Sequence, residues 1–466
     1  MRNGGAIAGF RDPRGHLCRQ DGVFLRRIHA GYEPEVLEVL ASEAVQALVR
    51  EGAVVATRQR APREKAGADG LELEHEAVPF ETVPVEWPAG MLATAGAHTL
   101  DVADRLLPSG FGLQDATPSN IQFVGTRPCL VDFLSIEKRR KTDPVWRAAA
   151  QLDRTFTLPL LARRLNPVTW RWTLGPRGIS PEELSASLGW LERMRPLVFW
   201  TATMPRWLAA SANRRGAVLY AKQIEVPEEE ALAVVAALFR RQRRRLLALA
   251  DPPRHRSPWQ GYQSHDGTRG ALKSAKLDIV SSVLRNRAYT QAMDLGCNQG
   301  DFSAVAARHG ATVVAIDADE TIVDGLWTRA TRERLPIVPL VVDLARPAGP
   351  LGWHAEIPSF VDRAHDRFDL VLALAIIHHL MVTERIPLDY LADFIGRTTR
   401  RTAIVEYVPP GDPMSTLLLR GNDPRPFAHL TLDRFLDAFA GHFSVTQTIT
   451  LEGTGRVLAM LERKAP

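Results

Sequence analysis

The sequence contains few cysteines, and none of them falls in a metal-binding or disulfide pattern. Only Cys18, Cys129 and Cys297 occur in 466 residues, without CxxC spacing. Small disulfide-stapled folds and zinc ribbons depend on closely spaced cysteines, so neither is expected here. The cysteine usage instead favours a reducing compartment such as the cytoplasm, and no metal site is evident.

The chain also lacks long hydrophobic runs. No apolar segment approaches the ~20 residues that span a bilayer. The first fifteen residues, MRNGGAIAGFRDPRG, lack the apolar centre of roughly 7–15 residues that a secretory signal carries. We therefore expect neither a membrane span nor a secretory signal.

Charge of one sign is not in large excess. Lysine and arginine number 58 against 53 aspartate and glutamate, which gives a net charge of +5. This balance does not call for a nucleic-acid partner. The one dense basic run, Arg240 to Arg245, lies in a helical pattern without interleaved aromatic residues, which favours a solvated helix face over a phosphate or acidic-surface contact. The oligomeric state is not indicated.

The length and two polar breaks predict two domains. A chain of 466 residues exceeds what one hydrophobic core usually organises. Residues 58–70 look like a loop, and residues 251–270, rich in Pro, Gly and charge, look like a linker. We expect a mixed, largely helical module over 1–250 and an α/β domain over 271–466. Trp259 and Tyr262 in the linker are candidates for a lid over a ligand.

A nucleotide-binding pattern opens the second half. AMDLGCNQG, residues 292–300, predicts a buried strand that ends in a glycine-containing turn, and a helix follows it. The next strand, TVVAID, closes on Asp317, 23 residues after Asp294. Gly296 and Gly300 allow close backbone approach to a ligand, and an acidic residue at the end of the next strand accepts hydrogen bonds from ribose hydroxyls.

The residue pattern of the turn distinguishes a dinucleotide from S-adenosylmethionine as the ligand. A dinucleotide site requires GxGxxG, whereas here Asn298 stands where the second glycine would fall. Asp294 before the first glycine would repel a pyrophosphate but attract the cationic methionine end of S-adenosylmethionine. The pattern therefore favours S-adenosylmethionine as the cofactor.

Five further strand-like runs follow, namely IVPLVVDLA ending near Asp343, FDLVLALA, TAIVEYV, FSVTQTIT and GRVLAMLER. Five parallel strands closed by an antiparallel hairpin make a seven-stranded Rossmann-like sheet that resembles the class I methyltransferase fold. By that resemblance Asp294, Gly296, Cys297, Asn298 and Gly300 surround the cofactor, while Asp317 holds its ribose and Asp343 meets its adenine.

A narrower resemblance covers most of the chain. The segments FRDPRG, DGVFLRRI, GFGLQDATPSNIQFVGTRPCLVDFLSIEK and VEYVPPGDPM resemble a bacterial methyltransferase family that includes host-specific nodulation proteins. The resemblance implies an N-terminal module joined to a C-terminal class I methyltransferase domain.

Two adjacent histidines are the candidate catalytic residues. His378 and His379 follow the fourth strand, at the edge where open α/β sheets bind ligands. Methyl transfer to oxygen or nitrogen requires alignment and a proton acceptor, and imidazole titrates near neutral pH. The alternative is that the two rings only pack or line the pocket. Glu406 and Tyr407 are expected in an ordinary polar rim, and Asp369 is expected to be structural.

A second constellation lies in the first half. Asp115 and Asn120, followed by Asp132 in CLVDF, match the D-x4-N and D-F spacing of kinase-like phosphotransferases. The only lysine before Asp115 is Lys65, in a polar loop, and no GxGxxG precedes it. We interpret residues 1–250 as resembling a degenerate kinase-like module that binds substrate or a partner.

Three functions are compatible with these patterns. The first is methylation of a small-molecule or saccharide acceptor. The second is ATP binding or phosphotransfer by Asp115, Asn120 and Asp132. The third is a non-catalytic binding protein that keeps the cofactor fold.

Overall fold

The computed structural model describes residues 6–8, 12–20, 23–60, 70–207, 225–250, 267–419, 423 and 425–464. The chain divides into two compact units, and the boundary falls between Pro253 and Arg254. Most of the predicted linker, with Trp259 and Tyr262, lies outside the described residues, as do Lys65 and most of the predicted loop at 58–70. Residues 267–270, which were assigned to the linker, already belong to a helix.

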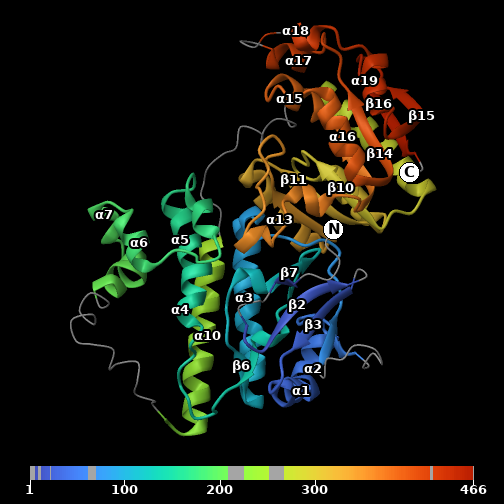
Figure 1. Ribbon diagram of the computed structural model, residues 1–466. Helices are drawn as coiled ribbons and strands as arrows, with labels where there is room; N and C mark the ends of the chain where they lie inside the picture. Colours follow the sequence, from blue (N-terminus) through green and yellow to red (C-terminus); the bar gives the residue numbers. More distant parts are fainter. Residues whose placement is uncertain are drawn as a thin grey trace. The chain divides into compact units, whose positions relative to one another are not determined.

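The second unit is built on a seven-stranded sheet (Figure 1). The strand order is β12-β11-β10-β13-β14-β16-β15, and only β16 runs antiparallel to its neighbours. The strands are β10 (Gln291–Leu295), β11 (Thr312–Asp317), β12 (Ile337–Val341), β13 (Phe368–Ala373), β14 (Thr399–Tyr407), β15 (Phe443–Thr450) and β16 (Val457–Arg463). This is the class I methyltransferase topology, so the predicted five parallel strands and terminal hairpin are confirmed.

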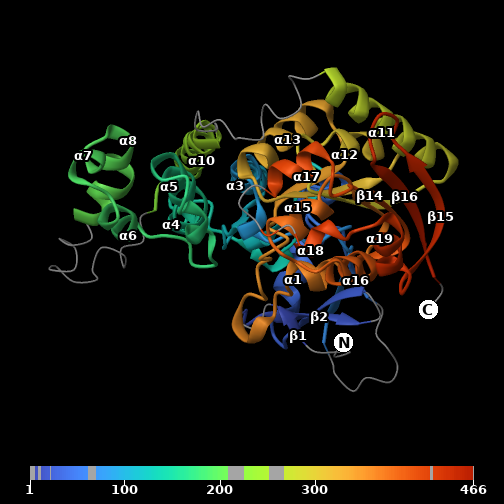
Figure 2. The same ribbon diagram turned by 90° about the horizontal axis from the view of Figure 1, so that it is seen from above.

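The strand sequences explain why the sheet is buried. The central strands β10, β11 and β13 are nearly continuous apolar runs, as expected for parallel strands covered on both faces. Helices α11 and α12 cover one face and α16 and α19 the other (Figure 2). The helices of this unit are α11 (Gly267–Asn286), α12 (Asp301–Arg308), α13 (Glu320–Glu333), α14 (Phe360–Ala364), α15 (Ile377–Val382), α16 (Leu388–Thr398), α17 (Pro413–Leu418), α18 (Arg425–Ala428) and α19 (Leu432–Phe439), with the 3-10 turn η9 (Trp353–Ala355).

Two contacts fix where strands begin. Asp369 at the start of β13 accepts hydrogen bonds from the backbone amides of Thr290 and Gln291, at 3.0 and 3.2 Å. It therefore joins the starts of β13 and β10 at the edge away from the strand ends. This is the structural role that its position in the sequence predicted.

The first unit contains a five-stranded antiparallel sheet that the sequence patterns did not locate. Its order is β1-β2-β3-β5-β4. The strands are β1 (Ala6–Ala8), β2 (Gly15–Gln20), β3 (Val23–Ile28), β4 (Thr57–Gln59) and β5 (Glu72–His75), with α1 (Glu33–Ala41) and α2 (Glu43–Arg50) inserted between β3 and β4. Two small two-stranded sheets follow, β6 (Phe111–Leu113) with β9 (Ile136–Lys138) and β7 (Ile121–Val124) with β8 (Arg127–Leu130).

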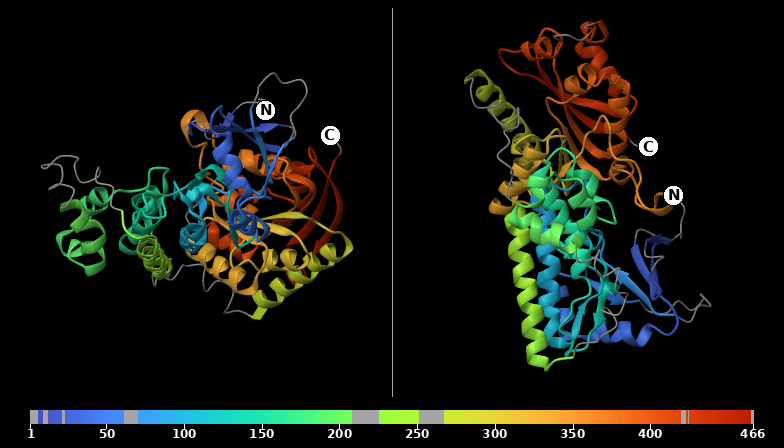
Figure 3. Two further views of the ribbon diagram at one scale, coloured as in Figure 1. Left: turned by 90° about the horizontal axis from the view of Figure 1, so that it is seen from below. Right: turned by 90° about the vertical axis from the view of Figure 1, so that its left-hand side faces the viewer.

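The helical part of the first unit centres on two long helices. Helix α3 (Ala89–Leu106) packs along α10 (Glu228–Ala250), as both views of Figure 3 make clear. Gly96 permits this approach, since a Cβ there would lie 2.9 Å from Leu246 of α10. Arg240, Arg241, Arg243 and Arg244 of α10 are exposed, which agrees with the predicted solvated face.

The remaining helices of this unit are short. They are α4 (Ala149–Leu152), α5 (Leu158–Leu165), α6 (Pro181–Ala186), α7 (Trp190–Arg193) and α8 (Pro196–Val198), with the turns η1 (Pro84–Glu86), η2 (Leu107–Ser109), η3 (Pro118–Asn120), η4 (Phe133–Ser135), η5 (Asp153–Thr157), η6 (Trp170–Leu174) and η7 (Phe199–Thr203). The stretch EELSASLGWLERM forms two helices rather than one, because α6 ends before Gly189, which caps α7. Among the described helices, none is long and apolar enough to cross a membrane.

Candidate functional site

The loop between β10 and α12 depends on its two glycines. Gly296 and Gly300 have φ angles of +66° and +73°, in the left-handed region that glycine tolerates best. A Cβ on Gly300 would lie 2.3 Å from Leu326, and one on Gly296 would lie 2.8 Å from Ile376. Asn298, between them, also has a positive φ of 46°. The loop therefore keeps its backbone close to the sheet edge, and only residues without a side chain fit at its two ends.

Cys297 is buried within this loop and lines the cavity beside it. Its amide donates to the carbonyl of Ile316 in β11 at 2.9 Å, which fastens the loop to the neighbouring strand. Burial raises the pKa of its thiol well above the usual value, so the thiol stays protonated at neutral pH. We infer a packing role for this side chain rather than a nucleophilic one.

Asp294 lies beneath the loop rather than in the cavity wall. It is 2% exposed, and Ser303 Oγ of α12 donates to its Oδ2 at 2.5 Å. Burial raises the pKa of Asp294 to about 7. Asp294 is not among the residues that line the cavity, and the cofactor contact expected from the sequence stays a prediction.

Asp317 joins the loop to the end of β11. Its Oδ2 accepts the amide of Asn298 at 3.1 Å, and its Oδ1 accepts the amide of Asp319 at 2.9 Å. Burial raises the pKa of Asp317 above its ordinary value. Its carboxylate lines the cavity and keeps lone pairs for further donors, because each oxygen can accept more than one hydrogen bond.

Asp343 occupies the end of the next strand. It follows β12 by two residues, lines the cavity and lies partly exposed. Its Oδ1 accepts the amide of Ala345 at 2.9 Å, and its Oδ2 lies 3.2 Å from Nε of Arg346. The two carboxylates predicted to hold ribose and adenine therefore stand at the ends of adjacent strands and face one cavity.

That cavity measures about 1160 Å³. Its walls come from α11, the loop after β10, the ends of β11, β12 and β13, the segment after β14, and the β15–β16 turn. Pockets that bury a drug-sized ligand measure roughly 300–1,000 Å³. The cavity is therefore large enough for a nucleoside-sized cofactor with a second molecule beside it.

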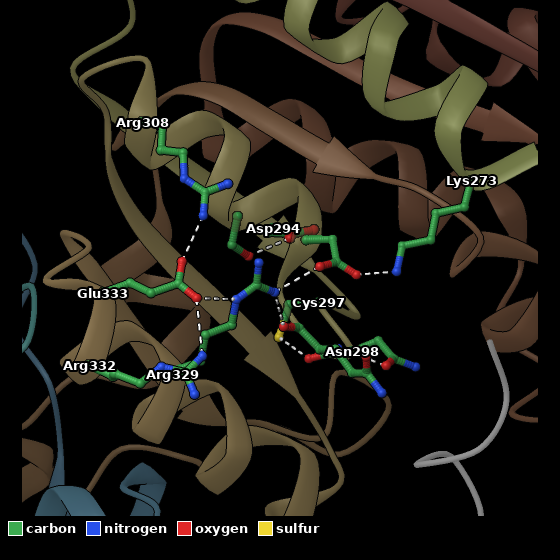
Figure 4. Close-up of polar contacts among 11 residues, drawn as sticks. Lys273, Asp294, Cys297, Asn298, Arg308, Arg329, Arg332 and Glu333 are labelled. Atoms are coloured by element: carbon green, nitrogen blue, oxygen red, sulfur yellow. Dashed lines mark hydrogen bonds and ion pairs between the residues drawn. The ribbon is translucent and has the colours of Figure 1, made fainter. Parts of the chain in front are cut away.

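Hydrogen bonds and ion pairs connect the glycine loop to the neighbouring helices (Figure 4). Asp301, at the start of α12, pairs with Lys273 of α11 and lies 2.7 Å from Nη1 of Arg329 on α13. The same guanidinium donates to the carbonyl of Gln299 at 3.1 Å. The carboxylate of Asp301 thus links the three helices, and the guanidinium of Arg329 ties them to the glycine loop.

His378 and His379 also line the cavity, at the start of α15. Their ring centroids are 4.4 Å apart. His378 is 3% exposed, and its Nδ1 is buried without a hydrogen-bond partner. Burial lowers the pKa of His378 to about 2 and that of His379 to about 4, so both rings are neutral near pH 7. Neutral imidazoles can accept a hydrogen bond or a proton from a neighbouring group.

Four charged side chains form a buried cluster next to the histidines, and sequence reasoning missed it. Lys276 of α11 contacts both oxygens of Glu406, at 2.6 and 2.7 Å. Arg456 binds Glu406 at 3.2 Å and Asp412 through two hydrogen bonds of 2.8 and 2.9 Å. All but Glu406 line the cavity. The predicted polar rim was therefore wrong for Glu406, which is 1% exposed because it is paired with two cations.

The kinase-like constellation lies in the first unit. Asp115 accepts from Gln151 at 3.2 Å, and Asn120 accepts from Thr117 at 3.1 Å. Asp132 follows the β7–β8 hairpin and lies 3.0 Å from Nη2 of Arg26, on β3. Burial raises the pKa of Asp132. Arg26 is the first of the two arginines in DGVFLRRI, and its pairing with Asp132 was not expected from the sequence.

Metal binding finds no support in these groups. No cluster of three or more His, Cys, Asp or Glu side chains suited to a metal ion occurs in the part of the chain that the structure describes.

Comparisons with known proteins agree with the topology. A family model described as a methyltransferase domain matches residues 293–388, from β10 to the start of α16. The chain is 28% identical over 469 residues to nodulation protein NoeA from Rhizobium meliloti (strain 1021). The alignment covers 98% of this chain and 96% of that protein.

Similar solved structures align with less than half of the chain. N-methyltransferase NodS from Bradyrhizobium japonicum WM9 is 13% identical with a TM-score of 0.33, and covers 46% of this chain and 94% of that one. Magnesium protoporphyrin IX methyltransferase from Synechocystis PCC 6803 is 16% identical with a TM-score of 0.31, and covers 43% and 88%. The strand order, the glycine loop and the match to the methyltransferase model identify the chain as an S-adenosylmethionine-dependent methyltransferase with a class I domain.

Proposed function

We propose that the enzyme methylates a small-molecule or saccharide acceptor that enters the cavity beside His378 and His379. The observation that carries this proposal is one cavity of about 1160 Å³ that is lined by the glycine loop, by Asp317 and by the two histidines. A cofactor bound at the loop leaves space next to the histidines. An acceptor in that space would lie beside both rings.

We assign the cofactor to the loop side of the cavity. The backbone of Gly296, Cys297, Asn298 and Gly300 would approach the cofactor closely, since two of these positions admit no side chain. Asp317 would accept hydrogen bonds from the ribose hydroxyls, and Asp343 would meet the adenine amino group. Asp294 would favour the positively charged methionine end from beneath the loop.

The reaction that this arrangement would promote is an in-line displacement. Bound S-adenosylmethionine supplies a methyl group on a sulfonium, which leaves as a neutral thioether. Alignment of the acceptor atom would supply most of the rate enhancement, because the leaving group needs no acid. An oxygen or nitrogen acceptor must also lose a proton, and the neutral rings of His378 and His379 are the nearest groups able to accept one.

The low pKa values favour His379 over His378 as the proton acceptor. A general base works best when its pKa lies near the operating pH. His379, with a pKa near 4, is closer to that optimum than His378, with a pKa near 2. We assign His378 the role of a positioning residue, since it is buried beside His379 with ring centroids 4.4 Å apart.

Calorimetric titration of the purified chain tests the cofactor site. S-adenosylmethionine is expected to bind, while NAD and Mg-ATP, run in parallel, should give no heat attributable to the second unit. A panel of hydroxyl- and amine-bearing small molecules and saccharides, with S-adenosylhomocysteine release as the readout, then searches for the acceptor. Cofactor binding without turnover on any member would leave the non-catalytic alternative standing.

For the first unit we propose a kinase-like module that binds without transferring phosphate. Support comes from the order of its parts, in which Asp115 and Asn120 precede the β7–β8 hairpin and Asp132 follows it, as in a kinase catalytic loop. The ion pair between Arg26 and Asp132 argues against phosphotransfer, because the carboxylate that would hold a metal ion is already neutralised. Titration with ATP in the presence and absence of Mg²⁺ tests this. Magnesium-dependent ATP binding that Asp132→Asn abolishes would overturn it.

A further inference from the structure

Tryptophan is unusually exposed in one part of the first unit. Four of the ten tryptophans, Trp172, Trp190, Trp200 and Trp207, are 87%, 73%, 64% and 57% exposed and lie within 36 residues. Tryptophan is highly buried on average, and soluble proteins rarely gather large apolar side chains on one surface. These four side chains therefore call for an explanation beyond packing.

The helix that carries Trp200 and Trp207 places its largest apolar side chains on the solvent side. Residues 196–207 form a continuous helical stretch through α8 and η7. Leu197, Trp200 and Trp207 fall at i, i+3 and i+10, on one outward face. The buried side chains of this stretch are the smaller Val198, Thr201, Ala202 and Thr203. The bulkiest apolar groups thus face solvent while small side chains face the interior.

Ring contacts link the outward tryptophans of this helix. The rings of Trp200 and Trp207 both contact the ring of Phe199, with centroids 5.4 and 5.7 Å away. Helix α7, which packs against η7, adds exposed Trp190 and Leu191. We call these exposed residues, Trp190, Leu191, Met194, Leu197, Trp200 and Trp207, the tryptophan face. Helices α6 and α7 lie apart from the β-sheet of their own unit (Figure 1).

Charge along the tryptophan face is mostly positive. From Trp190 to Trp207 the chain contains Arg193, Arg195 and Arg206 against one acidic residue, Glu192. Arg195, which is exposed, sits between Met194 and Leu197 of the tryptophan face. An apolar, tryptophan-rich helix face bordered by arginine is complementary to an anionic lipid surface, where indole rings occupy the interface and guanidinium groups meet headgroups.

We propose that the tryptophan face docks the protein on the surface of an anionic lipid bilayer. The helix would lie in the plane of the interface, with Trp200 and Trp207 inserted among headgroups and upper acyl chains and Arg195 at the phosphate level. Exposed indole rings together with arginine match the interfacial region of an anionic bilayer, which favours a lipid surface over a protein. Docking would bring the methyltransferase to acceptors held at a membrane, although the proposal does not depend on the reaction.

Flotation of the full chain with lipid vesicles tests this docking. Vesicles of equal parts phosphatidylglycerol and phosphatidylcholine are expected to bind the protein about tenfold more strongly than phosphatidylcholine alone. The double variant Trp200→Ala/Trp207→Ala should bind mixed vesicles at least tenfold more weakly. Arg195→Glu should reduce the preference for anionic vesicles. Acyl-chain-brominated lipids should quench the intrinsic fluorescence of the wild type more than that of the double variant.

The matched control is Trp353→Ala, which removes a 62% exposed tryptophan of the second unit and should leave vesicle binding unchanged. Calorimetric cofactor binding and the unfolding midpoint show that each variant remains folded. Equal binding of wild type and double variant to mixed vesicles would overturn the proposal. Self-association without lipid that the double variant abolishes, together with no vesicle binding, would overturn it too and assign the face to a second copy of the chain.

Discussion

Glu406 and Lys276 form a buried ion pair that joins the end of β14 to helix α11. Lys276 Nζ lies 2.6 Å from Oε1 of Glu406, and the two residues are 6% and 1% exposed. Burial lowers the pKa of Lys276. Arg456 provides Glu406 with a second cation, so the glutamate is the shared centre of the charged cluster beside the histidines.

This sharing predicts unequal effects of removing each partner. Glu406→Gln leaves Lys276 and Arg456 buried with only Asp412 to neutralise them, which should cost about 3–5 kcal/mol of unfolding free energy. Lys276→Met leaves Glu406 paired with Arg456 and should cost clearly less. Urea unfolding of both variants measures the difference. Equal destabilisation, or a larger loss in Lys276→Met, would contradict the shared-centre arrangement.

The parallel sheet could be predicted because its strands have a local signature, whereas the charged cluster has none. Each central strand is an apolar run bounded by a turn, so the sequence alone located β10 to β14 and the terminal hairpin. Lys276 and Glu406 are 130 residues apart, and Arg456 is a further 50 residues along the chain. Their pairing arises from tertiary packing, which no periodicity records.

The short elements of the first unit escaped prediction for a related reason. Its strands β1, β4 and β5 contain three or four residues, too few to establish an alternating pattern. Arg26 was overlooked because the kinase pattern calls for lysine at the cation's position. The spacing of Asp115, Asn120 and Asp132 only suggested a kinase-like loop, and the ion pair between Asp132 and Arg26 could be seen only in three dimensions.

Alanine substitutions at Gly300 and Gly310 distinguish the cost of backbone strain from the cost of steric crowding. Both have positive φ, +73° and +96°, but a Cβ on Gly300 meets Leu326 at 2.3 Å whereas one on Gly310 meets nothing within 4 Å. Gly310→Ala should therefore cost only the strain of roughly 1–2 kcal/mol. Gly300→Ala should cost more and weaken S-adenosylmethionine binding, as measured by urea unfolding and calorimetry.

A second substitution checks the cause of the Gly300 effect. Leu326→Ala opens the space that the new Cβ requires, so Gly300→Ala/Leu326→Ala should recover part of the cofactor affinity that Gly300→Ala loses. Additive losses in the double variant would show that crowding by Leu326 is not the reason for glycine at this position.

Asp317→Asn tests the proposed ribose contact. The substitution keeps one oxygen for a backbone amide but removes the charge and one acceptor, and charge-assisted hydrogen bonds contribute about 1.5–3 kcal/mol each. We expect S-adenosylmethionine affinity to fall on the order of a hundredfold in calorimetry. Asp389→Asn, at an exposed position on α16, is the control and should bind as the wild type does. Unchanged affinity in Asp317→Asn would show that Asp317 does not bind the ribose.

The depressed pKa values of the two histidines predict a loss of stability in acid. An unfolded histidine binds a proton near pH 6.5, whereas folded His379 and His378 do so only near pH 4 and pH 2. Between these values the unfolded chain binds more protons, so the folded state loses on the order of 1 kcal/mol per pH unit for each ring as pH falls below 6.5. Between pH 7 and pH 5 the unfolding free energy, measured with urea, should therefore drop less in His378→Gln/His379→Gln than in the wild type.

Asp294, with a raised pKa of about 7, acts in the opposite direction, but it is common to both proteins and cancels in the difference. His309→Gln, at an exposed position at the end of α12, should leave the pH dependence of the wild type unchanged. If the double variant and the wild type lose the same stability between the two pH values, the histidines are not held neutral by burial, and the proposed role of His379 as the proton acceptor loses its basis.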